Sequence, residues 1–156
     1  MFKRVNWKVF IVCVLVVYSV ALIGSIFTSQ STNSSWYDSI KPAITPPNYV
    51  FPIAWNILFI LIIFSLYFSW TEAKKIKEKK KIIILFGINF ILNILWSVFY
   101  FGMRNPSLAF IEIIFLWASI LLLVLGIYKT SKKASMLLLP YLLWVSFAGV
   151  LNYLSI

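Results

Sequence analysis

The chain has 156 residues, of which 62% are hydrophobic and 12% are charged. That balance lies far outside the range of soluble domains, so the composition excludes an ordinary soluble enzyme and favours an integral membrane protein. The 14 lysine and arginine residues against 4 acidic ones give a formal charge of +10, and the chain has no histidine and one cysteine. These counts exclude imidazole metal ligands, histidine-based triads and an intramolecular disulfide, so we expect no metal site.

Five apolar stretches are long enough to cross a bilayer core, which takes about 20 helical residues. The runs are continuous, without the alternation and shorter length of barrel strands, so we predict helices. The fold class is then an all-α integral membrane protein, a five-transmembrane-helix bundle that forms a single domain over residues 1–156. The predicted spans are residues 9–27, 49–70, 82–101, 107–128 and 134–154.

The first span follows a short basic segment and has the outline of a secretory signal. Its apolar run is longer than the signal core of roughly 7–15 residues, and no clear small-x-small cleavage site follows it. We therefore expect it to remain as a helix, with Cys13 packed in an apolar environment.

Residues 28–48 are predicted to form a proline-rich outer loop. Proline fixes φ and removes a backbone donor, so Pro42, Pro46, Pro47 and the nearby Pro52 oppose both helix and strand. The segment also carries apolar area in its aromatic side chains, which are Trp36, Tyr37, Tyr49 and Phe51. We interpret it as a stiff lid over a buried site.

Basic residues gather at one side of the predicted bundle. Twelve lie before the first span, after the second or after the fourth: Lys3, Arg4, Lys8, Lys74, Lys75, Lys77, Lys79, Lys80, Lys81, Lys129, Lys132 and Lys133. The other side has only Lys41 and Arg104. Short basic loops stay in the cytoplasm, so we expect a cell-membrane protein with its N terminus inside and its proline-rich loop and C terminus outside.

This topology also accounts for the net charge. Lipid is the expected macromolecular partner, because anionic lipid of the inner leaflet attracts basic residues near the surface. Nucleic acid is not expected, since no soluble domain accompanies the basic run. Residues 74–81 are interpreted as a solvated turn.

Polar and aromatic side chains converge on the outer half of the bundle. One group shares a face of the third span at spacings of four, four and three: Asn89, Asn93, Ser97 and Tyr100. A second recurs every four residues on the fifth span: Pro140, Trp144, Ala148 and Asn152. The asparagines are equally compatible with a ligand site and with hydrogen bonds between helices, worth about 0.6 kcal/mol each. A mid-depth Trp144 needs a partner for its N–H.

Glu112 lies about one and a half turns into the fourth span. An ionised carboxylate in a membrane helix costs about 2.5–3.5 kcal/mol on insertion scales. We therefore expect Glu112 to face the bundle and to be either paired with a donor or protonated, with Arg104 on the adjoining loop as the candidate partner.

Several runs spaced over almost the whole chain form one pattern. They are Trp36-Tyr37-Asp38 with Lys41-Pro42, Thr45-Pro46-Pro47 and Trp55; Asn89-x-x-x-Asn93-x-x-Trp96-Ser97; Ala109-Phe110-Ile111-Glu112; and Pro140-Tyr141-Leu142-Leu143-Trp144-Val145-Ser146-Phe147-Ala148 with Leu151-Asn152-Tyr153. This pattern resembles the TspO/MBR family, the tryptophan-rich sensory proteins that include the translocator protein.

The resemblance implies a five-helix bundle, commonly dimeric, that binds porphyrins such as protoporphyrin IX and haem. Indole faces can stack on a tetrapyrrole, and asparagine amides or Lys41 can meet its propionates. The residues that we predict to contact the ligand are Tyr37, Lys41, Trp55, Asn89, Asn93, Trp96, Trp144 and Ala148. Porphyrin or haem is then a ligand, and no obligatory cofactor is expected.

Three function classes follow. We favour a membrane tetrapyrrole-binding protein acting as a stress-related sensor, regulator or scavenger. The second is an enzyme that degrades porphyrin in light, which would use Trp55 and Trp144, since the chain supplies no nucleophile–base pair. The third is a transporter of porphyrin or sterol-like ligands, which an odd number of helices and no visible broken-helix pair disfavour.

Two further properties are weakly encoded. Specific cholesterol binding is not expected, because no lysine or arginine follows Tyr153. A homodimer is implied by the resemblance, and two small-x-x-x-small pairs on the first span, Ala21 with Ser25 and Gly24 with Thr28, fit either an interface or internal packing.

Overall fold

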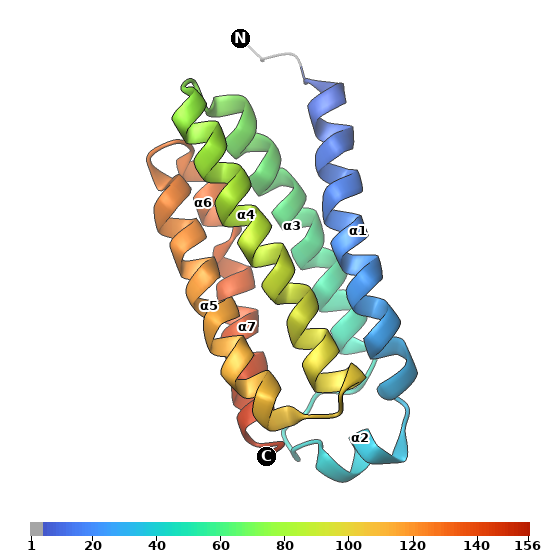
Figure 1. Ribbon diagram of the computed structural model, residues 1–156. Helices are drawn as coiled ribbons and strands as arrows, with labels where there is room; N and C mark the ends of the chain where they lie inside the picture. The colour runs from blue at the N-terminus through green and yellow to red at the C-terminus, as the bar shows by residue number, and fades with distance from the viewer. Residues whose placement is uncertain (1–4) are drawn as a thin grey trace.

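The computed structural model describes residues 5–156 as a bundle of long helices (Figure 1). All regular elements in this range are helical, and five segments are long and apolar enough to span a membrane. They are Trp7–Ser31, Val50–Glu72, Ile76–Gly102, Pro106–Tyr128 and Lys132–Tyr153. The predicted fold class is confirmed. Lys3 and Arg4, two of the basic residues assigned to one side, lie outside the described residues.

Two of the long helices begin at residues whose side chains accept from N–H groups of the first turn. Asn6 accepts from the Val9 N–H at the start of α1 (Trp7–Ser31), and Asn105 accepts from the Leu108 N–H at the start of α5 (Pro106–Tyr128). The other spanning elements are α3 (Val50–Glu72), α4 (Ile76–Ser97) with the π-helical turn η1 (Val98–Gly102), α6 (Lys132–Leu137) and α7 (Leu139–Tyr153). Closely packed pairs include α4 with α5, α5 with α7, and α3 with α1 and α6.

The lysine run after α3 is mostly helical, so its interpretation as a solvated turn is wrong beyond residue 75. Only residues 73–75 connect the two helices, and α4 begins at Ile76. The Glu78 carboxylate accepts from the backbone N–H groups of Lys74 and Lys75 at 2.8 and 3.0 Å. This cap supplies partners for N–H groups that precede the helix, and the charged first turns of α4 extend beyond the apolar run.

The fifth span, predicted over residues 134–154, is observed as Lys132–Tyr153 and is interrupted at the single residue Leu138. The helix stops at Leu138, between α6 and α7, and Pro140 lies in the first turn of α7. Proline is tolerated there because an N–H in the first turn has no partner within its own helix. α6 packs on both α3 and α5, while α7 packs along α5.

The segment predicted as a proline-rich loop is partly helical. α1 continues to Ser31, and the short helix α2 (Ser35–Ile40) follows, its Tyr37 N–H donating to Ser34 Oγ at 3.2 Å. Residues 32–34 and 41–49 lack regular structure, and Pro52 lies in the first turn of α3. Resistance to helix therefore holds for the stretch that contains Pro42, Pro46 and Pro47.

α2 is docked on the π-helical end of α4. Trp36 and Tyr37 contact the rings of Tyr100 and Phe101 at centroid distances of 6.0 and 5.7 Å. Ser31 Oγ donates to the Phe101 carbonyl at 3.2 Å and ties the end of α1 to the same turn. The proline-rich stretch is therefore anchored at its N-terminal side by aromatic packing on η1.

Two glycines bring α1 close to the α4 segment. A Cβ on Gly102 would lie 2.9 Å from Phe27 Cδ1, closer than real Cβ atoms approach, so any other residue there would force the Phe27 ring to shift. Gly24 is buried against Ser97. The side of α1 that carries Gly24 therefore serves internal packing, one of the two uses that the small-residue pairs left open.

Candidate functional site

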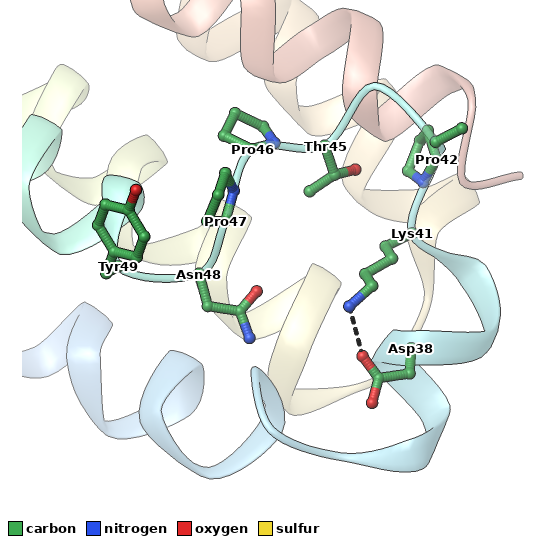
Figure 2. A pocket seen from close by; sticks show the side chains of 9 residues that line it. Asp38, Lys41, Pro42, Thr45, Pro46, Pro47, Asn48 and Tyr49 are labelled. Carbon is green, nitrogen blue, oxygen red and sulfur yellow. Dashed lines mark hydrogen bonds and ion pairs between the residues drawn. The ribbon is translucent and has the colours of Figure 1, made fainter.

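A pocket of about 570 Å³ lies along the proline-rich stretch at the end of the bundle where the C terminus lies (Figures 1 and 2). The residues that line it are Asp38, Lys41, Pro42, Ala43, Thr45, Pro46, Pro47, Asn48 and Tyr49. We call it the loop pocket. Prolines form part of its lining, and the charged, hydroxyl and amide side chains of the lining provide polar groups.

Two polar interactions hold the loop pocket. Lys41 Nζ donates to Asp38 Oδ1 at 2.6 Å, as the dashed line in Figure 2 shows, and both side chains are exposed. Asn48 Nδ2 donates to the Thr32 carbonyl at 3.3 Å and so joins the loop to the end of α1. Thr45 Oγ1 is buried and has no hydrogen-bond partner among residues 5–156. The pocket therefore offers a cation, an anion and an unpaired hydroxyl oxygen.

Tyr37 is buried beside this pocket and does not line it. Its ring packs on Phe101, and Lys41 Nζ lies 5.9 Å from the ring centroid. Burial, with smaller contributions from Tyr100 and Asp38, raises the pKa of Tyr37 to about 12, so its hydroxyl remains neutral at physiological pH. Tyr37 and Trp55 belong to separate apolar clusters.

An aromatic column fills the space between α3 and α7. Phe51 contacts Trp144 at a centroid distance of 6.0 Å, and Trp55 contacts Tyr141 at 6.2 Å. Phe51 and Trp55 are four residues apart and share one face of α3. We define the aromatic column as these four residues, Phe51, Trp55, Tyr141 and Trp144. It begins two residues after Tyr49 of the loop pocket.

Trp144 carries an unpaired donor in this column. Its Nε1 is buried and has no acceptor within the described part of the chain, although the ring itself packs between Phe51 and Phe147. The expectation that a mid-depth tryptophan finds a partner for its N–H is therefore wrong for the protein alone. An unsatisfied buried donor costs about 1–3 kcal/mol.

Asn89 and Asn93 take part in a hydrogen-bond network inside the bundle. Asn93 Nδ2 donates to the Tyr141 hydroxyl at 3.0 Å, and that hydroxyl donates to Asn89 Oδ1 at 3.3 Å. Asn89 Nδ2 donates to Ser119 Oγ at 2.9 Å. The network joins α4, α5 and α7, so both asparagines form the hydrogen bonds between helices that were one of their two expected uses. A role of either asparagine in ligand contact stays a prediction.

Sequence reasoning did not select Tyr141 and Ser119 for the site. Both occur on apolar spans, where a single hydroxyl carries no periodic signal. The signal that could identify Tyr141 is its place beside Pro140, because a proline in the first turn marks the start of a helix and so fixes the depth of its neighbour.

Trp96 also has a hydrogen-bond partner. Its Nε1 donates to Asn152 Oδ1 at 3.0 Å, and Asn152 Nδ2 donates to the Pro106 carbonyl at 2.8 Å. The indole stacks on Tyr100 at 5.3 Å. Trp96 and the half-buried Ala148 both pack against the main apolar core.

Glu112 faces the interior as expected, with 5% of its surface exposed. Its expected pairing with Arg104 is wrong, because both carboxylate oxygens lack a partner among residues 5–156. Arg104 has a positive φ of 50°, and its guanidinium lies 5.7 Å from the Trp36 ring centroid. The turn before α5 thus directs Arg104 to α2 and away from the bundle interior.

A second cavity is a mainly apolar groove of about 430 Å³ between α5 and α7. Its wall includes Phe110, Trp117 and Tyr153, and Trp117 Nε1 donates to Ser146 Oγ at 2.8 Å. None of the predicted ligand residues lines this groove. Of the predicted residues, only Lys41 lines the loop pocket. Trp55 and Trp144 belong to the aromatic column, and Asn89 and Asn93 belong to the asparagine network. Trp96 and Ala148 pack against the main apolar core, and Tyr37 belongs to the smaller apolar cluster with Phe101.

Comparison with known proteins identifies relatives over most of the chain. The tryptophan-rich protein TspO of Chlorobaculum tepidum is 39% identical, with 90% of this chain and 89% of that protein covered. The protein of the same name from Archaeoglobus fulgidus is 40% identical, with 90% of each chain covered. The translocator protein of Bos taurus is 27% identical, with 84% of this chain and 80% of that protein covered. Because the TspO/MBR family model also matches residues 11–155, this chain belongs to the TspO/MBR family.

Proposed function

We propose that the protein is a membrane tetrapyrrole-binding protein that takes protoporphyrin IX or haem and acts as a stress-related sensor, regulator or scavenger. The observation that carries this proposal is the unpaired Trp144 Nε1 in the aromatic column next to the loop pocket. A ligand that is flat, mostly apolar and edged with acceptor groups would supply both stacking area and a partner for that donor.

The loop pocket supports the same ligand chemistry. Lys41 and its partner Asp38 are both exposed, with Asp38 the more open to solvent, so the ion pair is easily exchanged for a ligand carboxylate. In this proposal Lys41 meets a propionate while the ring lies against the indoles of the column. The prolines keep the loop in few conformations, which lowers the entropy lost on binding.

We also propose that the loop pocket faces outward from the cell membrane and that the N-terminal end of α1 faces the cytoplasm. The turns from α3 to α4 and from α5 to α6 lie at the end opposite the C terminus (Figure 1). These turns and the helix ends beside them carry nine lysines: Lys74, Lys75, Lys77, Lys79, Lys80, Lys81, Lys129, Lys132 and Lys133. Anionic lipid headgroups are the partners that such an end would meet.

The test of binding is a titration of the purified protein in nanodiscs, in the dark, with protoporphyrin IX and separately with haem. The proposal predicts saturable quenching of the protein's tryptophan fluorescence. A control sample of empty nanodiscs mixed with a soluble tryptophan-containing protein should show less quenching. Quenching that rises linearly with porphyrin and matches that control would contradict the proposal.

A light-dependent porphyrin-degrading enzyme is the second candidate. It is favoured by the proximity of two oxidisable rings, Trp55 and Tyr141, at a centroid distance of 6.2 Å. Mass spectrometry of porphyrin incubated with the protein in light and in dark separates the two functions. A product that requires both light and the protein, and that is lost when Trp55 and Trp144 are replaced by phenylalanine, supports the enzyme.

A further inference from the structure

Glu112 on α5 is a buried carboxyl to which the proposed function assigns no role. Its exposed fraction is 5%, and neither Oε1 nor Oε2 has a hydrogen-bond donor within residues 5–156. It shares the most buried face of α5 with Ala109, Leu116 and Ser119, which are 0%, 1% and 7% exposed. Both acceptor oxygens therefore lie inside the bundle without a partner.

Cross-helix hydrogen bonds fix the depth of Glu112. The Asn89–Ser119 bond joins α4 to α5, so these two residues lie at the same depth. Trp96 lies seven residues after Asn89 and Glu112 lies seven residues before Ser119, both toward the loop pocket. The Trp117–Ser146 bond joins α5 to α7, and five residues from it lead to Glu112 and Leu151. At about 1.5 Å per residue, Glu112 is level with Trp96 and within one turn of Ala148.

The donors near this level are engaged with other acceptors. Trp96 Nε1 donates to Asn152 Oδ1, and the Asn152 amide donates to the Pro106 carbonyl. The Asn93 amide donates to the Tyr141 hydroxyl, and Arg104 lies over Trp36. A carboxyl at membrane depth that accepts no hydrogen bond from the described residues is the type of group that marks a functional site.

We propose that Glu112 is a ligand-contacting acceptor that selects flat ligands carrying an N–H group. This inference rests on the proposed function and makes its substrate class narrower. A free-base tetrapyrrole has two N–H groups at the centre of its ring, and a metal chelate has lost both. A carboxyl oxygen facing the ring accepts a hydrogen bond from a central N–H of the free base. The metal chelate has no central N–H to donate, so Glu112 favours free-base porphyrin over its square-planar chelates.

The test compares protoporphyrin IX with its nickel(II) chelate, which has the same propionates and ring edge but no central N–H. Nickel(II) is chosen because it is stable in square-planar geometry. Affinities are measured in the dark, in nanodiscs, by tryptophan quenching, for the wild type, Glu112→Leu and Glu112→Gln. The matched control is Glu72→Gln, because Glu72 lies at the opposite end of the bundle on α3.

The wild type is expected to bind the free base more tightly than the chelate. Glu112→Leu is expected to weaken free-base binding by about tenfold or more and chelate binding by less than about threefold. Glu112→Gln retains an acceptor oxygen, so its affinity for the free base is expected to lie between those of the wild type and Glu112→Leu. This variant decides the outcome if the leucine variant does not fold. Glu72→Gln is expected to leave both affinities unchanged.

Equal losses for the two porphyrins, or no loss in either Glu112 variant, would overturn this inference while leaving the proposed function intact. Failure of the wild type to bind either porphyrin would overturn the proposed function itself.

Discussion

The Tyr141 hydroxyl accepts a hydrogen bond from Asn93 Nδ2 at 3.0 Å and thereby joins α7 to α4 inside the membrane. Tyr141 is also the point where two systems meet, since its hydroxyl belongs to the asparagine network and its ring to the aromatic column. Trp55 therefore contacts the ring of a residue whose hydroxyl takes part in a helix–helix hydrogen bond.

Replacing Tyr141 with phenylalanine should destabilise the bundle. The change leaves Asn93 Nδ2 and Asn89 Oδ1 without their shared partner, and hydrogen bonds of this kind in membranes are worth about 0.6 kcal/mol and at most about 1.7 kcal/mol. Thermal unfolding in detergent, followed by circular dichroism, measures the loss. Tyr153→Phe is the control because Tyr153 is 61% exposed. Equal melting temperatures for the two variants would contradict the role of the network.

Trp144→Phe should separate ligand binding from stability. The variant removes the unpaired Nε1 but keeps an aromatic ring, so the free energy of unfolding of the ligand-free protein should be unchanged or higher. Protoporphyrin IX binding should weaken about fivefold to tenfold, since one hydrogen bond to the ligand is lost. Unfolding experiments without ligand and porphyrin absorbance titrations provide the two measurements.

The control for that variant is Trp117→Phe, in which the opposite result is expected. Trp117 Nε1 already donates to Ser146 Oγ, so its removal should lower stability and leave porphyrin affinity unchanged. If Trp144→Phe lowers stability as Trp117→Phe does and leaves affinity intact, then Trp144 is a structural residue.

Substitutions of the two partners in the Asp38–Lys41 ion pair should change porphyrin affinity in opposite directions. Lys41→Gln should weaken protoporphyrin IX binding, and Asp38→Asn should strengthen it, because the lysine is then free for a propionate. Exposed ion pairs are worth up to about 1 kcal/mol, so each change should be about fivefold or less. The dimethyl ester of the porphyrin, which has no carboxylate, should show neither effect. A matching response of the ester would show that Lys41 acts through loop structure alone.

Gly102→Ala should loosen the docking of α1 and α2 on η1. The added methyl would lie 2.9 Å from Phe27 Cδ1, and overpacking of this kind costs about 1–3 kcal/mol. Phe27→Leu in the same chain should recover part of the loss by making room. Gly87→Ala is the matched control, since nothing lies within 4 Å of a Cβ there and alanine favours helix. Hydrogen exchange of the amides in α2 and η1 reports the effect locally.

The sequence was sufficient to predict what depends on length, hydropathy and the cost of burying charge. The five spans follow from apolar runs of about 20 residues, and the inward orientation of Glu112 follows from the free energy of a carboxylate in lipid. The helix ends differ from the predicted spans because capping by Asn6, Glu78 and Asn105 is a local polar interaction outside the apolar run.

Features that depend on contacts between distant segments could not be predicted in this way. The interruption at Leu138 separates α6, which packs on α3 and α5, from α7, which packs on α5, and η1 forms where α1 and α2 dock. The direction of Arg104 depends on one positive φ in a short turn. The depth of Trp144 predicts a hydrogen-bond partner, but only the packed structure shows that its N–H has none within residues 5–156.

The central claim is that a tetrapyrrole binds against the indoles of the aromatic column. Its most direct test is the dissociation constant of protoporphyrin IX for the wild type and for Trp55→Ala with Trp144→Ala, measured by porphyrin absorbance in the dark. Loss of two stacking rings should weaken binding by at least about thirtyfold while circular dichroism shows an intact helical bundle. An unchanged dissociation constant in a folded double variant would contradict the claim.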